Sequence, residues 1–146
     1  MNNIQTEIEA VACPQTHNTV RVVDSAIDCP DLPIIVGSGR AKAVMWPGNG
    51  ALYRTFQVLD LEPNDQTIAL VHPSDSAYYV AAGSGVIADL NSGERMPLVE
   101  GSMVHIDKGD HYRFEAAETA GLKLIGGPCP ADPQLYAHLT TAGEAV

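Results

Sequence analysis

Residues 70–90 read LVHPSDSAYYVAAGSGVIADL and contain two β-favouring runs around a glycine-rich break. Residues 76–82 and 85–90 are rich in valine, isoleucine and tyrosine, which strands prefer, and GSG at 83–85 lies between the runs. A single histidine, His72, precedes them. The stretch therefore predicts two short strands separated by a turn, with one imidazole close to the first strand.

Similar short runs follow one another along the rest of the chain, cut by Gly, Pro, Asn and Asp, and helical periodicity is nearly absent. The other predicted strands are residues 19–25, 32–37, 41–46, 51–61, 67–72, 101–107, 111–116 and 122–127. NSGE at 91–94 predicts a hairpin turn, because Asn and Gly tolerate positive φ. Many short strands at this spacing indicate a sandwich or a barrel.

The end of the chain is the one segment with a helical pattern. Asp132 is placed to cap a helix and Pro133 suits its first turn. We divide the 146 residues into a loosely held segment (1–16), a barrel (17–130) and a C-terminal helical tail (131–146). The N-terminal strands are expected to pair across a homodimer, because an unpaired sheet edge favours association.

Composition argues against several partners. The formal charge is −10 and the eight Lys and Arg residues are scattered, so we expect no nucleic acid binding and no attraction to an anionic membrane. No apolar run is long enough to span a membrane, and the N-terminus does not resemble a signal peptide. Three cysteines without CxxC spacing favour a reducing, cytoplasmic location.

From about residue 59 to 116 the sequence resembles the cupin superfamily. In the first cupin motif a His-x-His pair and a glutamate lead to a strand and a glycine. Here Leu70 stands at the first histidine position, His72 matches the second, and Ser76 stands at the glutamate position. YYVAAGSG at 78–85 is similar to the end of that motif, and Asn64 replaces a turn glycine that precedes it.

The second cupin motif begins at Gly101. Gly109 matches it, Asp107 replaces its proline, and Tyr112 stands where its histidine belongs. The resemblance implies an all-β fold of the cupin type, a double-stranded β-helix or jelly-roll barrel, with a short C-terminal helix. It does not select one activity, because cupins include oxygenases, isomerases, epimerases, cyclases, lyases and sugar-binding regulators.

The residues at the cupin ligand positions make a poor metal site. One imidazole and a phenol fall short of the three protein ligands of a usual catalytic ion, so the leading prediction has no cofactor. A one-residue slip at two turns gives the alternative of His72, Asp75 and His111 around a single divalent transition metal. Strand parity opposes that slip, although bulges at the turns would allow it. His105 alternates with Val104 and Ile106 and is expected to face away from the barrel interior.

With the motifs in register, the interior side chains form a mixed pocket for a small organic molecule. They are Leu70, His72, Ser76, Tyr78, Val80 and Tyr112. We predict metal-independent acid–base chemistry of the isomerase, epimerase, cyclase or lyase type, with His72 as the base and Tyr112 or Tyr78 as the acid. Metal-free cupin sugar epimerases use a similar pair of His and Tyr.

Two further residues and two further functions remain open. Arg54 and Gln57 cannot both face inward, because their separation along a strand is odd; an inward Arg54 would bind a substrate carboxylate or enolate oxygen. The alternative functions are a metal-dependent oxygenase or cyclase that uses His72, Asp75 and His111, and a non-catalytic domain that binds or senses a ligand.

Overall fold

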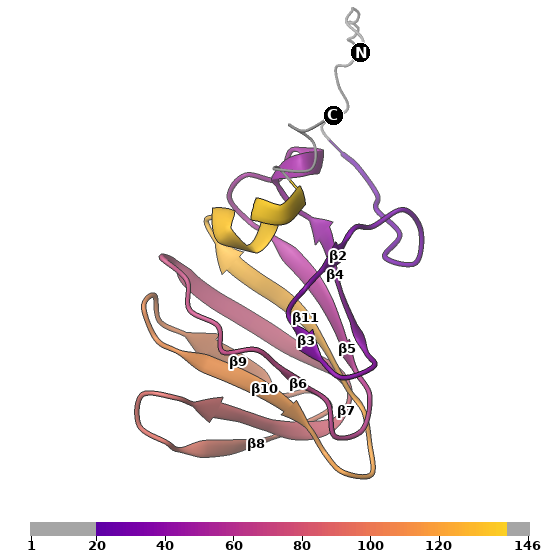
Figure 1. Ribbon diagram of the computed structural model, residues 1–146. Coiled ribbons are helices and arrows are strands. Elements are labelled where there is room, and N and C mark those ends of the chain that lie inside the picture. Colours follow the sequence, from indigo (N-terminus) through magenta and orange to yellow (C-terminus); the bar gives the residue numbers. More distant parts are fainter. Residues whose placement is uncertain (1–19, 140–146) are drawn as a thin grey trace, which may run out of the picture.

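The computed structural model describes residues 20–139. Its strands pair antiparallel in two sheets, which β7 joins into a nearly closed barrel (Figure 1). The strands are β2 (Asp31–Leu32), β3 (Ile35–Val36), β4 (Arg40–Met45), β5 (Phe56–Leu61), β6 (Gln66–Thr67), β7 (Asp75–Asp89), β8 (Arg95–Val99), β9 (Met103–Ile106), β10 (Tyr112–Ala116) and β11 (Leu122–Cys129). The described residues also contain two 3-10 helices, η1 (Pro47–Asn49) and η2 (Pro133–Tyr136). The predicted all-β jelly-roll fold with a short C-terminal helix is confirmed.

The long strand β7 belongs to both sheets. Its first half pairs with β9 and β11, and its second half pairs with β8 and β10. The predicted break at residues 83–85 is therefore wrong, since the strand continues through it. Gly83, at φ 84°, lets the chain pass from one sheet into the other while its neighbours remain in the ladders.

Other boundaries also differ from the sequence prediction. Residues 20–25 and 51–55 form no strand, and the predicted strand 67–72 reduces to β6 and an isolated bridge between Leu70 and Tyr112. β8 was not predicted because it contains Pro97; it pairs only with β7, and an edge strand tolerates a residue without an N–H. The hairpin turn at 91–94 is confirmed between β7 and β8, and Asn64 has the expected positive φ of 70°.

Strand alternation sorts the side chains of β7 between the interior and solvent. Ser76, Tyr78 and Val80 are buried, whereas Asp75 and Tyr79 are exposed. Leu59, Val80, Phe114 and Leu124 are completely buried in the core between the sheets, and each such apolar side chain contributes about 1.5–3 kcal/mol through burial. The interior of the barrel is thus packed with side chains along most of its length.

The segment around η2 covers one end of the barrel, beside η1 (Figure 1). Asp132 caps η2 as predicted, because its Oδ1 accepts a hydrogen bond from the Gln134 N–H at 3.0 Å. Tyr136 is buried against Trp46, with ring centroids 5.2 Å apart, and donates a hydrogen bond from its hydroxyl to Gln57 Oε1 at 2.8 Å. These contacts attach the C-terminal segment to the barrel.

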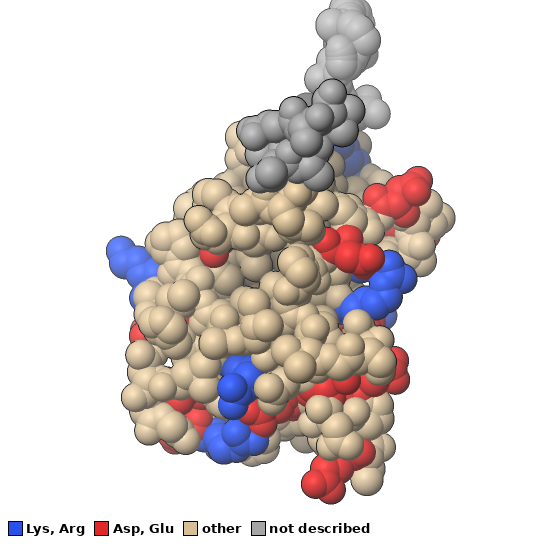
Figure 2. Space-filling model, viewed as in Figure 1, with Lys and Arg blue, Asp and Glu red and all other residues tan. Residues whose placement is uncertain are grey.

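Within residues 20–139, no helix has both the length and the apolar character needed to span a membrane. Figure 2 shows that Lys and Arg do not gather into a continuous patch on the face drawn. The predicted segment 1–16 lies outside the described residues, as does the end of the predicted tail beyond residue 139.

We expect Gly83→Ala to lower the free energy of unfolding by about 3 kcal/mol. A Cβ at residue 83 would lie 1.9 Å from the Gly121 carbonyl oxygen, in addition to the strain of a positive φ. Gly93 is the matched control, because it has φ 83° and nothing within 4 Å of an added Cβ. Gly93→Ala should cost only about 1 kcal/mol in urea unfolding. Equal losses in the two variants would contradict the role given to Gly83.

Candidate functional site

Four buried side chains form a continuous chain of hydrogen bonds inside the barrel. Asp132 Oδ2 lies 2.6 Å from His72 Nδ1, and His72 Nε2 lies 2.7 Å from the Tyr112 hydroxyl. The Tyr112 hydroxyl lies in turn 3.1 Å from that of Tyr78. The four residues come from the segment before η2, the segment before β7, β10 and β7, so parts of the chain that are distant in sequence assemble them.

One arrangement of protons satisfies every group in this chain. The Asp132 carboxylate only accepts hydrogen bonds, so His72 Nδ1 carries a proton and donates it there. His72 Nε2 then accepts from the Tyr112 hydroxyl, and the Tyr112 oxygen accepts from Tyr78. A carboxylate on one imidazole nitrogen thus makes the other nitrogen a proton acceptor, which is the arrangement that activates hydroxyl groups in catalytic triads.

Burial keeps both phenols of this chain protonated. Desolvation raises the pKa of Tyr78 to about 12, and the hydrogen bond with Tyr112 lowers it only in part. Desolvation also raises the pKa of Tyr112 well above its usual value, with the neighbouring Tyr78 adding to the effect. At neutral pH neither residue therefore exists as a free phenolate.

Ser76 lies beside this chain with its hydroxyl unused. Its side chain is 2% exposed, and Ser76 Oγ is the single buried side-chain polar atom among the described residues without a partner at hydrogen-bonding geometry. It is close enough to Tyr112 to lower the pKa of that phenol slightly. The hydroxyl is thus available to Tyr112 if the phenol rotates or ionises.

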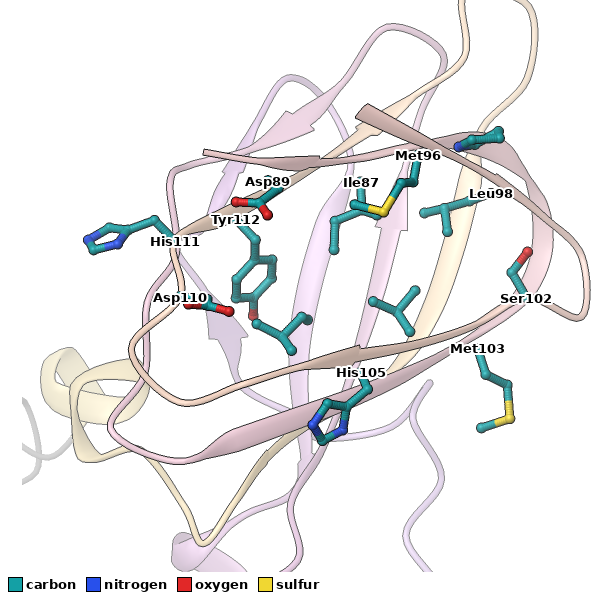
Figure 3. Close-up of a pocket in the computed structure, with 13 residues that line it drawn as sticks. Ile87, Asp89, Met96, Leu98, Ser102, Met103, His105, Asp110, His111 and Tyr112 are labelled. Atoms are coloured by element: carbon teal, nitrogen blue, oxygen red, sulfur yellow. The ribbon is translucent and has the colours of Figure 1, made fainter. Parts of the chain in front are cut away.

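A cavity of about 400 Å³ opens between β8 and β9 and reaches Tyr112 (Figure 3). Its size lies at the lower end of the range for small-molecule sites. Tyr112 lines this cavity, whereas His72, Ser76 and Tyr78 do not. Within the hydrogen-bonded chain, Tyr112 is therefore the member that a molecule in the cavity would contact.

The remaining predicted pocket residues separate into two groups. Leu70 and Gln57 are buried, and Gln57 Nε2 donates to the Gly126 carbonyl oxygen at 3.4 Å. Arg54 is exposed in the segment before β5, so the inward orientation on which its predicted substrate contact depended is not met. Arg54 lies outside β5, so strand parity does not set its orientation, and only Gln57 is inside.

The alternative metal set of His72, Asp75 and His111 is corrected by the structure. Asp75 and His111 are exposed, each next to a buried strand residue, and both ring nitrogens of His72 bond to other side chains. The β7–β9 and β7–β10 ladders run without a register shift, so strand parity holds next to both residues.

A different group of metal-ligating residues does assemble on the outside of the barrel. Ligand atoms of Asp75, His105 and Asp107 lie within 4.8 Å of one another, and all three residues are exposed. His105 faces outward as predicted, and its Nε2 lies 3.0 Å from Asp107 Oδ1. The group depends on the pairing of β9 with β7, which no local sequence motif predicts.

Asp132 is the site residue that the sequence did not reveal. Its position before a proline predicts a helix cap, and it fulfils that role with Oδ1 while Oδ2 binds His72. The two residues are 60 positions apart and share no motif. Only the return of the chain over the barrel end brings them together.

No protein-family model and no curated protein matches the sequence. Several solved structures are similar to this chain in fold. A cupin-like protein from Thermotoga maritima has a TM-score of 0.63 at 20% identity, over 71% of this chain and 77% of its own. The chain has the cupin fold. The polyketide cyclase RemF from Streptomyces resistomycificus has a TM-score of 0.63 at 18% identity, over 78% and 82% of the two chains.

A third solved structure with a similar fold is an enzyme of a different name. Ectoine synthase from P. lautus has a TM-score of 0.58 at 15% identity, over 82% of this chain and 83% of its own. The likeness to these proteins extends to the fold, and the residues around His72 must be interpreted from their own geometry.

The buried phenol of Tyr78 predicts a specific loss of stability at alkaline pH. Folding raises the pKa of Tyr78 from 10.0 to about 12, so between these values the phenol ionises in the unfolded protein but not in the folded one. The free energy of unfolding therefore keeps its full value below pH 10 and falls as the pH rises toward 12. The loss attributable to Tyr78 is at most about 3 kcal/mol. Tyr78→Phe should therefore show a shallower fall in unfolding free energy between pH 10 and 12. Identical pH slopes for the two proteins would contradict the burial argument.

Proposed function

We propose that the protein binds a small organic molecule in the cavity beside Tyr112 and catalyses metal-independent proton transfer on it. The reaction would be of the isomerase, epimerase, cyclase or lyase type. The observation that supports this most strongly is the hydrogen-bonded chain from Asp132 through His72 to Tyr112, which ends at the cavity wall. Neutral imidazole held by a carboxylate is a common base near neutral pH.

In this proposal His72 acts through Tyr112. Both ring nitrogens of His72 are engaged, so a proton leaving the substrate passes to the Tyr112 oxygen while the Tyr112 proton passes to His72 Nε2. Asp132 stabilises the imidazolium that results. The raised pKa of Tyr112 requires the two transfers to occur together, because a free phenolate does not accumulate. The reverse transfers return a proton to the product at a different position.

A second candidate is a metal-assisted reaction in the same cavity, and the position of His105 favours it. His105 belongs both to the cavity lining and to the exterior group with Asp75 and Asp107. A divalent ion held by those three residues would supply a Lewis acid at the edge of the cavity. Metal analysis and chelation separate the two candidates, since the first uses only groups of the chain.

We expect the protein to accelerate hydrogen–deuterium exchange at a carbon next to a carbonyl group. The measurement is proton NMR in D2O with small aldehydes, ketones and keto acids, including cationic, neutral and anionic members. Tyr112→Phe, His72→Gln and Asp132→Asn should each reduce the exchange rate at least about 100-fold, the usual contribution of a positioned acid or base. Chelation should leave the rate unchanged.

His111→Gln is the matched control, because His111 is an imidazole that lines the cavity and lies outside the hydrogen-bonded chain. Its rate should stay close to that of the unmodified protein. Exchange that depends on His111 and not on His72 would contradict the proposal, as would the absence of exchange with every compound. Exchange that is abolished by chelation and restored by a divalent ion would favour the second candidate.

A further inference from the structure

The cavity beside Tyr112 contains carboxylates and no balancing cation. Asp89 and Asp110 are among the residues that line it, and within the described part of the chain no Lys or Arg does so. The apolar part of the lining consists of Ile87, Met96, Pro97, Leu98, Met103, Val104 and Ile106. A molecule in this cavity would therefore meet an apolar wall and a negative charge together.

Asp89 is fixed as a carboxylate at the end of β7. Its Oδ1 accepts hydrogen bonds from the backbone N–H groups of Asn91 at 2.9 Å and Ser92 at 3.2 Å. These hydrogen bonds lower the pKa of Asp89, so it is negatively charged at neutral pH. The Ser92 side chain adds a further hydrogen bond to this carboxylate, which lies in the lining of the cavity.

Asp110 supplies a second carboxylate from the turn before β10. Its side chain makes no hydrogen bond and no ion pair with the part of the chain that the structure describes, although its backbone N–H donates to the Asp107 carbonyl oxygen at 3.1 Å. Figure 3 shows Asp89 and Asp110 on the side of the cavity where Tyr112 and His111 lie. The negative charge is thus concentrated at the proposed reaction centre.

The arginines of the adjoining strands do not neutralise this charge. Arg95 of β8 and Arg113 of β10 both bind Glu115, which Arg113 Nε contacts at 2.9 Å. Neither arginine lines the cavity. Because Glu115 holds both of them, neither arginine offsets the negative charge of Asp89 and Asp110 at the cavity.

A single metal ion would fit this set of residues poorly. The one group of three Asp, Glu, His or Cys ligands within 4.8 Å among residues 20–139 is Asp75, His105 and Asp107, and only His105 of that group lines the cavity. Separated carboxylates and an aromatic ring suit a more extended cation. We propose that the cavity takes a small organic cation, an amine with an apolar body, and this rests on the proposed function for the location of the site.

Three probes with the same ring and different charge test this inference: cyclohexylammonium, cyclohexanol and cyclohexanecarboxylate. Binding is followed at pH 8 through the methyl NMR signals of Ile87, Leu98 and Ile106. We expect the cation to bind at least about tenfold more tightly than the neutral ring, and the anion to bind most weakly. Added salt should weaken the binding of the cation and leave the binding of cyclohexanol unchanged.

Asp89→Asn and Asp110→Asn should each reduce the affinity for cyclohexylammonium several-fold and leave cyclohexanol binding unchanged. Glu100→Gln is the matched control, because it removes one exposed negative charge at a residue that does not line the cavity. Its affinity for the cation should equal that of the unmodified protein.

Equal binding of the three probes, preference for the anion, or no binding of the cation would each overturn the inference. Displacement of cyclohexylammonium by magnesium at matched ionic strength would also overturn it. The site would then bind a simple inorganic cation without any need for an apolar body. These measurements do not use turnover. Loss of His72-dependent exchange with cation binding intact would reject the proposed function alone, and exchange without a preference for cations would reject only the charge assignment.

Discussion

The 2.6 Å hydrogen bond between the buried carboxylate of Asp132 and His72 is the contact on which the rest of the site depends. An isolated buried carboxylate is costly, and here it is satisfied by the imidazole N–H on one oxygen and by the Gln134 N–H on the other. The same bond decides which nitrogen of His72 is free to accept a proton. The direction of the hydrogen bonds through Tyr112 to Tyr78 then follows from it.

The barrel supplies the positions that this interaction requires. β7 contributes Tyr78 and Ser76 on its inner face and continues past Gly83 into the second sheet, where Asp89 ends it at the cavity. β10 contributes Tyr112, whose backbone also bridges to Leu70 near His72. A stiff framework of this kind holds side chains from distant parts of the sequence within hydrogen-bonding distance, which proton transfer demands.

The sequence predicts what its resemblance to the cupin motifs, strand parity and local turn chemistry determine. The cupin resemblance implies the fold and the interior positions of His72, Ser76, Tyr78 and Tyr112, which are buried. Alternation with Val104 and Ile106 predicts the outward orientation of His105. The sequence does not predict the partnership of Asp132 with His72 or the cavity between β8 and β9, because both depend on contacts between distant segments. The sequence does not predict β8, because Pro97 disfavours a strand everywhere except at the edge of a sheet, and the edge position is known only from the structure.

The protonation of His72 tests the account most directly. Long-range proton–nitrogen NMR spectra, assigned by comparison with the His72→Gln variant, distinguish a protonated ring nitrogen from an unprotonated one. The account predicts that at neutral pH the proton of His72 resides on Nδ1, toward Asp132, and that Nε2 accepts a hydrogen bond from Tyr112. A proton on Nε2, or an average of the two tautomers, would contradict it.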